Sequence, residues 1–329
     1  MPFDVLSGKS VLVTGGTGSF GQKFVDLALR KSQVKRLVVF SRDEWKQSQM
    51  QEQFSDERLR FFLGDVRDGQ RLHRAFKGVD LVVHAAALKQ VHTLEYNPFE
   101  AVLTNVIGAQ NVINAAIDQN VPKVVALSTD KAVNPINLYG ATKLCAEKLF
   151  INGNAYAGVS PTRFAVVRYG NVLGSRGSVV PFFRDRKKTG VLPITDERMT
   201  RFWITLEESV ELVLHTAKHM QGGEIFVPKI PSMKVTDLAM AIAPECRLET
   251  VGKRPGEKLH EVLLTEDEAT RTSDVGKYYV VEPEFTWQKE NGHPNGRGGQ
   301  KVPANLRYSS DANNAWLTRK ELAEILQKP

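Results

Sequence analysis

Short apolar runs alternate with longer polar or amphipathic segments through the first half of the chain. This alternation is the feature that most limits what the chain can fold into. The apolar runs are at 10–15, 35–41, 58–65, 79–86, 123–129 and 163–172. Their length and their Val and Leu content predict buried β-strands, and segments such as 21–32 and 138–153 have helical spacing. Repeated strand–helix units predict an α/β fold, a doubly wound parallel sheet with helices on both faces.

The pattern changes after about residue 172, where segments become shorter and Pro and Gly are scattered. We expect helices at 205–220, 234–243 and 318–328, with Thr caps opening the last two, and a short strand at 224–228. The Gly- and Pro-rich stretch 289–305 predicts a mobile loop. We expect one domain over 1–172 and a smaller mixed α/β lobe over 173–329, with parts of the later chain returning to the first domain.

Composition excludes several classes of protein. The 329 residues are 42% hydrophobic and 25% charged, which is ordinary for a soluble globular protein. No apolar run is long enough to span a membrane, and the first residues do not resemble a signal peptide, so we expect a cytoplasmic protein without membrane partners. Cys145 and Cys246 lie far apart and predict neither a disulfide scaffold nor a metal site. The net charge of +7 is spread along the chain, which argues against nucleic-acid binding and suits anionic ligands.

A glycine-rich turn follows the first predicted strand and opens the first predicted helix. Gly15, Gly18 and Gly21 form the pattern G-x-x-G-x-x-G. Glycines let the backbone approach a pyrophosphate, and the helix N-terminus presents free N–H groups. A glycine triplet alone also fits a tight turn, but the strand before it and the helix after it favour a Rossmann-like dinucleotide site.

The end of the second predicted strand favours NADP over NAD. Its first polar residues are Ser41 and Arg42, with Lys46 one helical turn later. A hydroxyl and two cations suit a 2′-phosphate, whereas a free 2′-hydroxyl is usually met by an acid. The neighbouring Asp43 and Glu44 keep open the alternative that these cations are ordinary surface charges. Further predicted contacts are Asp65 to the adenine amino group and Ala85 beside the nicotinamide-side ribose.

Tyr139 and Lys143 are four residues apart, on one face of the helix predicted after the fifth strand. A nearby ammonium lowers the pKa of a phenol, so the pair suits proton removal from a sugar hydroxyl as hydride leaves the carbon. Thr129, at the end of that strand, is the predicted hydroxyl partner. Simple alcohol oxidation leaves the preceding acid–base doublet, Asp130 and Lys131, without a role.

These motifs resemble the extended short-chain dehydrogenase/reductase superfamily. The stretches "HAAALKQV", "STDKAVNPINLYGATK", "RYGNVLGSRGSVVPFF" and "LPITDERMTRFWI" resemble, more closely, the inverting UDP-N-acetylglucosamine 4,6-dehydratases. The resemblance covers about residues 5–275. It implies the first step of pseudaminic-acid-type sugar synthesis and a homo-oligomer, a dimer or a hexamer.

The resemblance gives the doublet a role. Oxidation at C4 of the sugar acidifies the C5 proton, so water can leave across C5 and C6, and the hydride then returns to C6. The resemblance implies Lys131 as general base at C5 and Asp130 as the group that assists the leaving hydroxyl. Retaining dehydratases carry Asp-Glu here, so the lysine implies inversion. A lysine base must be neutral when it acts, so we expect a depressed pKa for Lys131; the alternative is a structural ion pair with Asp130.

Two sets of ligand-binding residues complete the prediction. The cofactor set is Gly15, Thr17, Gly18, Ser19, Phe20, Gly21, Ser41, Arg42, Lys46, Asp65, Val66, Ala85, Thr104, Tyr139, Lys143 and Val172. The substrate set implied by the resemblance is Lys89, Asn171, Thr195, Met199, Arg201, Arg254 and Glu257. Arg254 and Glu257 are expected at the uridine end.

Three other functions stay open. A UDP-sugar 4-epimerase shares the fold and the Tyr139–Lys143 pair but has no elimination to catalyse. A retaining 4,6-dehydratase differs only in stereochemistry. A non-catalytic NADP-binding regulator would keep the glycine loop and would tend to lose the tyrosine–lysine pair, which this chain retains.

Overall fold

The computed structural model describes residues 2–285 and 299–327. Among these residues, the largest sheet has ten strands, in the order β16-β14-β15-β10-β6-β5-β4-β1-β2-β3. The seven parallel strands are β1 (Ser10–Thr14), β2 (Arg36–Ser41), β3 (Leu59–Leu63), β4 (Leu81–His84), β5 (Lys123–Thr129), β6 (Arg163–Tyr169) and β10 (Ile225–Pro228). The antiparallel strands β15 (Tyr278–Val281), β14 (Thr272–Asp274) and β16 (Gln300–Lys301) extend one edge. The predicted parallel sheet is confirmed.

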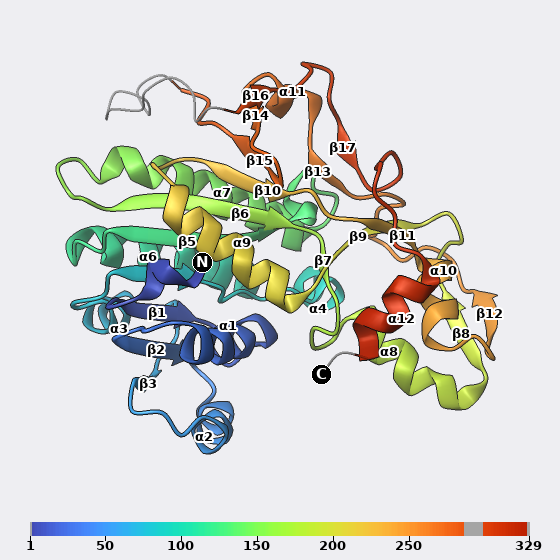
Figure 1. Ribbon diagram of the computed structural model, residues 1–329, viewed down its shortest axis with the longest axis horizontal. Coiled ribbons are helices and arrows are strands. Elements are labelled where there is room, and N and C mark those ends of the chain that lie inside the picture. Colours follow the sequence, from blue (N-terminus) through green and yellow to red (C-terminus); the bar gives the residue numbers. More distant parts are fainter. Residues whose placement is uncertain (1, 286–298, 328–329) are drawn as a thin grey trace.

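Helices cover both faces of this sheet (Figure 1). One layer contains α3 (Gly69–Ala75), α6 (Gly108–Asp118) and α7 (Leu138–Tyr156). In this layer α6 contacts both α3 and α7. The other contains α1 (Ser19–Lys31), α9 (Leu206–His219) and the 3₁₀ helix η1 (Pro2–Leu6). Helix α2 (Glu44–Gln53) lies beside β2 and β3 at the sheet edge, and α4 (Val91–Tyr96), α5 (Pro98–Val102) and the π-helix η2 (Leu103–Ile107) connect β4 to α6.

A smaller lobe lies to the right of the sheet in Figure 1 and has its own apolar core. Its helices are α8 (Val179–Arg186), the 3₁₀ helix η4 (Lys187–Thr189), α10 (Val235–Ile242) and α12 (Arg319–Gln327), and β8 (Val191–Ile194) pairs with β12 (Arg247–Thr250). Phe183, Trp203 and Leu322 are buried at its centre. The lobe therefore packs around side chains from distant parts of the sequence.

Seven further elements complete the described part of the chain. In a three-stranded sheet, β9 (Thr200–Ile204) lies between β7 (Asn171–Val172) and β11 (Ser232–Lys234). Strand β13 (Val262–Leu264) pairs with β17 (Tyr308–Ser309), followed by α11 (Glu266–Ala269), and the 3₁₀ helix η3 (Asp130–Ala132) follows β5. Because β7 directly continues β6, the carboxyl end of the main sheet leads into the smaller lobe.

Three local expectations need correction or qualification. Strand β3 is an edge strand with Arg60 and Leu63 exposed, not a fully buried one. Helix α10 begins at Val235 after Lys234, which makes no side-chain cap, so Thr236 does not cap it. Within the stretch predicted as a loop, residues 289–298 lie outside the described residues, and Gln300–Lys301 forms β16. The Thr318 cap of α12 is confirmed, since its hydroxyl accepts a hydrogen bond from the Glu321 N–H.

A buried arginine ties the main sheet to α7 and to the C-terminal segments. Arg168 in β6 has a side chain that is only 2% exposed. Its guanidinium pairs with Glu147 of α7 at 2.7 Å and with Glu268 of α11 at 3.0 Å, and it donates to the Leu263 carbonyl of β13 at 3.1 Å. Each group of this network has a charged partner, as buried charges require.

We predict that Arg168→Ala lowers the free energy of unfolding by about 3–5 kcal/mol, because it leaves two buried carboxylates without their partner. Urea denaturation followed by circular dichroism measures this change. Arg198→Ala is the matched control, because Arg198 is 74% exposed in its pair with Asp196; exposed pairs contribute about 0–1 kcal/mol. Equal effects of the two substitutions would contradict the prediction.

Candidate active site

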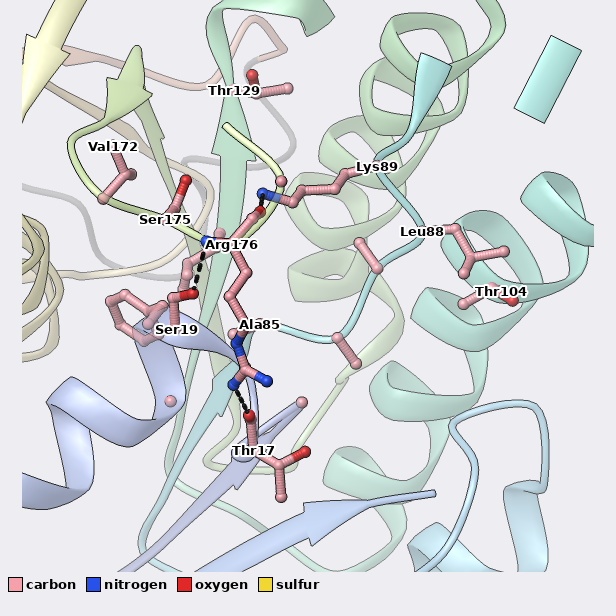
Figure 2. A pocket seen from close by; sticks show the side chains of 18 of the residues that line it. Thr17, Ser19, Ala85, Leu88, Lys89, Thr104, Thr129, Val172, Ser175 and Arg176 are labelled. Atoms are coloured by element: carbon pink, nitrogen blue, oxygen red, sulfur yellow. Dashed lines mark hydrogen bonds between the residues drawn. The ribbon is translucent and has the colours of Figure 1, made fainter. Parts of the chain in front are cut away.

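A cavity of about 600 Å³ opens at the carboxyl ends of the six parallel strands β1 to β6 (Figure 2). This is where ligands bind in open α/β sheets. All the residues predicted to bind the cofactor line it, from Gly15 to Val172. Thr129, Lys131, Lys89 and Asn171 line it too. The structure thus brings together residues from six strand ends and from the segment after β7, and their assignment to ligands stays a prediction.

Two glycine positions in the glycine-rich stretch that leads from β1 into α1 have no room for a side chain. Gly15 has φ of 66°, and a Cβ atom there would lie 2.9 Å from the Ala86 backbone. A Cβ atom on Gly21 would lie 2.4 Å from the Gly16 backbone. Residues 17–21, at the start of α1, line the cavity, and a helix N-terminus has free N–H groups that suit a pyrophosphate. The chain therefore fits a dinucleotide cofactor at this turn.

The polar groups expected at a 2′-phosphate lie together, and neighbouring carboxylates balance their charge. The Thr17 and Ser41 hydroxyls are 2.9 Å apart. Lys46 pairs with Asp43, and Arg42 lies 3.6 Å from Asp65. All four charged side chains lie beside or line the cavity. Arg42 and Lys46 therefore line the cavity, and both form ion pairs with neighbouring carboxylates. Whether they bind a 2′-phosphate stays a prediction.

Asp65, expected to accept a hydrogen bond from adenine, already has partners within the chain. Its carboxylate accepts from the Arg67 side chain at 2.8 and 3.0 Å and from the Arg67 backbone N–H at 3.0 Å. Burial alone would raise the pKa of Asp65, but the Arg67 hydrogen bonds and the charges of Arg67 and Arg42 outweigh it, and the pKa is lowered. Asp65 is therefore an ionised acceptor in this structure, with Arg67 as its principal partner.

Arg176 is a cavity residue that the sequence reasoning missed. Figure 2 shows its guanidinium reaching from the segment after β7 to the Thr17 carbonyl of the glycine-rich turn. Its backbone N–H donates to the Ser19 hydroxyl at 3.0 Å, and its carbonyl accepts from Lys89 at 3.1 Å. Residue 176 therefore connects the turn after β1 with the loop after β4. No local pattern marks it, since its partners are far away in the sequence.

Asn105 in η2 is a second missed residue, and it positions two walls of the cavity. Its side chain accepts from the Leu88 N–H at 2.8 Å and donates to the Leu88 carbonyl at 2.9 Å. It also donates to the Thr142 hydroxyl at 3.0 Å, between Tyr139 and Lys143 in α7. Asn105 lies in a π-helical turn, and such turns are frequent at functional sites. The structure shows this turn, whereas no pattern in the sequence indicates it.

Tyr139 and Lys143 project into the cavity from α7, as predicted. Lys143 donates to the Leu127 carbonyl at 2.7 Å, and burial lowers its pKa to about 8. Burial raises the pKa of Tyr139 to about 12, while Lys131 and a hydrogen bond with Thr129 act in the opposite direction. Among the protein groups alone, desolvation exceeds the effect of the nearby cation. The expected lowering, which also relied on the positive charge of a nicotinamide, stays a prediction.

The Asp130–Lys131 doublet forms a direct hydrogen bond beside Tyr139. The Lys131 Nζ donates to Asp130 Oδ1 at 2.9 Å and to Asn171 Oδ1 at 3.3 Å, and the Thr129 hydroxyl donates to Asp130 Oδ1 at 2.9 Å. Lys131 is 26% exposed and lines the cavity, whereas Asp130 is fully buried behind it. Any ligand in the cavity therefore meets the lysine first.

The expected depression of the Lys131 pKa is wrong. Burial alone would lower the pKa, but the carboxylates of Asp130 and Glu261 outweigh it, and the pKa of Lys131 is raised. Glu261 lies 3.7 Å from Lys131 and belongs to the segment just before β13. Burial raises the pKa of Asp130, with Lys131 opposing the shift and Glu261 adding to it. The surroundings therefore favour the protonated form of each group of the doublet.

The predicted substrate residues of the later chain do not line this cavity. Arg201 is buried and donates to the carbonyls of Lys258 and Leu259 at 2.9 and 3.0 Å. Thr195 donates to the Met199 sulfur at 3.1 Å, and Arg254 is exposed. Glu257 has a buried carboxylate oxygen without a hydrogen-bond partner among the described residues. Direct ligand contact stays a prediction for all five residues, Thr195, Met199, Arg201, Arg254 and Glu257.

The parallel sheet covered by helices on both faces, with a cavity at the carboxyl ends of its strands, defines a Rossmann-like fold of the extended short-chain dehydrogenase/reductase type. Residues 11–283 match the family model described as polysaccharide biosynthesis protein, and the chain belongs to this family. It is 51% identical to the UDP-N-acetylglucosamine 4,6-dehydratase (inverting) of Campylobacter jejuni subsp. jejuni serotype O:2, over 97% of each chain. It is 44% identical to the UDP-glucose 4-epimerase of Rickettsia akari, over 83% of this chain and 82% of the relative.

A solved structure agrees over nearly the whole chain. The X-ray structure of Pen from Bacillus thuringiensis has a TM-score of 0.89 and 38% identity, covering 98% of both chains. The resemblance inferred from the sequence motifs is thereby confirmed, and so is the Rossmann-like fold. No helix of the described residues has both the length and the apolar character needed to cross a membrane.

We predict that Gly140→Ala pushes α7 away from the 3₁₀ helix η3, which contains Lys131. A Cβ atom at Gly140 would lie 2.1 Å from the Lys131 carbonyl, and backbone atoms cannot move aside as a flexible side chain can. The substitution should cost about 1–3 kcal/mol of stability. Misplacing Tyr139 by about 1 Å should also reduce turnover by on the order of 100-fold. Gly69→Ala is the control, since its Cβ would make only ordinary contacts with Asn111; equal turnover of both variants would contradict the prediction.

Proposed function

We propose that the chain catalyses NADP-dependent dehydration of UDP-N-acetylglucosamine to UDP-2-acetamido-2,6-dideoxy-β-L-arabino-hex-4-ulose. The observation that carries the proposal is the placement of two proton-transfer pairs in one cavity. Tyr139 with Lys143 and Lys131 with Asp130 lie at the ends of β5 and at the start of α7. The first pair suits ketone–alcohol chemistry, and the second suits elimination beside the ketone. The name of the Campylobacter jejuni relative supports the same reaction.

The cofactor supplies one kind of chemistry: NADP, when bound, accepts a hydride from C4 of the sugar and returns it to C6. The glycine-rich turn would hold the pyrophosphate, and Ser41, Arg42 and Lys46 would hold the 2′-phosphate. Lys143 is placed beside the Leu127 carbonyl, where it would hold the nicotinamide ribose. Tyr139 removes the proton of the 4-hydroxyl group as C4 becomes a ketone. Because the ketone remains in the product, this proton does not return to the 4-oxygen.

The doublet carries out the elimination. Lys131 rests as an ammonium, and its 2.9 Å hydrogen bond to Asp130 lets a proton pass to the carboxylate. The resulting neutral amine takes the C5 proton, and the C5–H electron pair expels the 6-hydroxyl group. A proton from the pair converts the departing hydroxide into water, with Asp130 as the assisting acid. The pair gains one proton from C5 and loses one to the departing hydroxide. A proton from solvent then adds to C5 from the opposite face, which gives inversion, and Tyr139 releases to solvent the proton that it took from the 4-hydroxyl group.

The sugar's place in metabolism and the oligomer follow from the family resemblance. The product would enter synthesis of pseudaminic-acid-type sugars, and we propose a homo-oligomer, a dimer or a hexamer. In the later chain, Arg254 and Glu257 are the proposed contacts to the uridine end. Lys89 and Asn171 are the proposed contacts to the sugar and diphosphate, since both line the cavity.

A UDP-sugar 4-epimerase is the second candidate, because the Rickettsia akari relative bears that name. An epimerase needs Tyr139 and Lys143, and a keto-sugar that can rotate within the cavity to present its other face. It has no proton to remove at C5. The hydrogen-bonded Asp130–Lys131 pair facing the cavity therefore favours the dehydratase.

We predict that incubation with UDP-N-acetylglucosamine in deuterium oxide gives a 4-keto-6-deoxy product with deuterium at C5 and L-arabino stereochemistry. Proton NMR follows the reaction. Lys131→Ala should reduce turnover by about 10²–10⁴-fold, the range for loss of a general acid or base, yet still bind NADP. A 4-epimer without deuterium would contradict the dehydratase, and D-xylo stereochemistry would contradict only the inversion.

We further predict that Arg42→Ala weakens NADP binding about tenfold while leaving NAD binding nearly unchanged. A charge-assisted hydrogen bond to a phosphate is worth about 1.5–3 kcal/mol, and only NADP has the 2′-phosphate. Titration of the reduced cofactors, followed by their fluorescence, measures both affinities. Arg74→Ala removes an equal charge from the exposed face of α3 and serves as control. Parallel losses for both cofactors would contradict the assignment.

A further inference from the structure

Glu261 is the buried charge closest to the catalytic doublet that comes from another part of the chain. It is 2% exposed and lies at the end of the segment 256–261, immediately before β13. Its Oε1 atom is 3.7 Å from the Lys131 Nζ and 3.9 Å from Arg201, and its Oε2 atom is 3.6 Å from Lys258. Its backbone N–H donates to the Ser310 hydroxyl at 2.9 Å. The carboxylate therefore stands among three cations in a fixed backbone frame.

The segment that carries Glu261 is held at two points of the chain just after Lys131, Val133 and Asn137. Lys258 donates to the Val133 carbonyl at 2.6 Å. Asn137 at the start of α7 donates to the Gly256 carbonyl at 2.8 Å. Arg201 of β9 holds the same segment through the carbonyls of Lys258 and Leu259. The distance between Glu261 and Lys131 is thus set by several independent contacts.

We propose that Glu261 is a positioning residue that keeps one proton on the Asp130–Lys131 pair. Its negative charge favours the ammonium of Lys131, and it disfavours ionisation of Asp130. Both effects act in the same direction, because each opposes the loss of the proton that the two groups share. The pair behaves as one coupled acid, so its proton count, and not the location of the proton, is what Glu261 controls.

The proton count matters for the proposed dehydration, on which the functional part of this inference rests. Elimination needs one base and one acid at the same moment. A pair with one proton supplies both, whereas a fully deprotonated pair has no acid for the leaving hydroxyl. Glu261 itself stays ionised: burial alone would raise its pKa, but Lys131, Arg201 and Lys258 outweigh burial and lower it.

Other charged groups near the pair do not replace Glu261. Tyr139 of α7 faces Lys131 and is neutral with a raised pKa. Lys89 is a cation, and by repulsion it disfavours the proton on the pair. His260, next to Glu261, is directed to the Thr200 hydroxyl at 2.8 Å. Among the described residues, Glu261 is thus the acidic group that forms an ion pair with Lys131 besides Asp130.

The test measures the proton on Lys131 directly in the NADP-loaded protein. Trace labelling with acetic anhydride across a pH series modifies only neutral amines, and mass spectrometry of the Lys131 peptide gives the labelled fraction. In Glu261→Gln, labelling of Lys131 should begin at least one pH unit lower, with about tenfold more label at an intermediate pH. Glu261→Asp keeps the charge and should retain most of the wild-type behaviour.

Glu266→Gln is the matched control, because it removes the same charge from an exposed residue of the same region. Unchanged labelling of Lys131 in folded Glu261→Gln would overturn the proposal. If Glu261→Gln does not fold, Glu261→Asp takes its place in the test. The proposal would be overturned equally if Lys131 in Glu261→Asp were labelled at as low a pH as Lys131 in unfolded protein. With substrate, the alkaline limb of the kcat/KM profile should move to lower pH in Glu261→Gln. Labelling needs no turnover, so failure of the dehydratase assignment is seen separately.

Discussion

The guanidinium of Arg168 joins β6, α7 and the chain segment formed by β13 and α11. From β6 it pairs with Glu147, one helical turn beyond Lys143 in α7, and with Glu268 in α11. It also holds the Leu263 carbonyl in β13, close to Glu261 in the sequence. Because all these groups are buried, separating any of them from Arg168 would leave a charge without a partner. Arg168 therefore helps to fix the positions of Lys143 and Glu261 relative to the sheet, together with the Lys143 hydrogen bond to Leu127 and the Glu261 hydrogen bond to Ser310.

Local chemistry explains the part of the site that the sequence predicts well. The glycine-rich turn and the Tyr139–Lys143 spacing are short patterns, and each needs only the adjacent strand and helix to acquire its geometry. The strands whose ends carry these residues are parallel neighbours, so their carboxyl ends meet at one edge. Predicting the strands was thus enough to predict that Gly15, Ala85 and Thr129 surround one cavity.

Long-range contacts explain what the sequence did not predict. Arg176 and Asn105 act through Thr17 and Leu88, which are distant in the chain, and no periodic pattern identifies such pairs. The sign of the Lys131 pKa shift was wrong for the same reason. Its neighbours in sequence suggested burial and a single acid, whereas the second carboxylate arrives from the segment before β13. The half-exposed edge strand β3 likewise reflects its place in the sheet order, which apolar content alone does not determine.

The arrangement of charge at the catalytic end suits an anionic substrate. Lys131, Arg201 and Lys258 carry three positive charges around the two carboxylates of Asp130 and Glu261, which leaves the group with one net positive charge. Both carboxylates are buried, whereas Lys131, Lys89 and Arg176 line the cavity. An approaching diphosphate therefore meets cations first, while the anions behind them keep the lysine protonated. The overall charge of +7, which no nucleic-acid or membrane motif explains, is in part concentrated where an anionic ligand would bind.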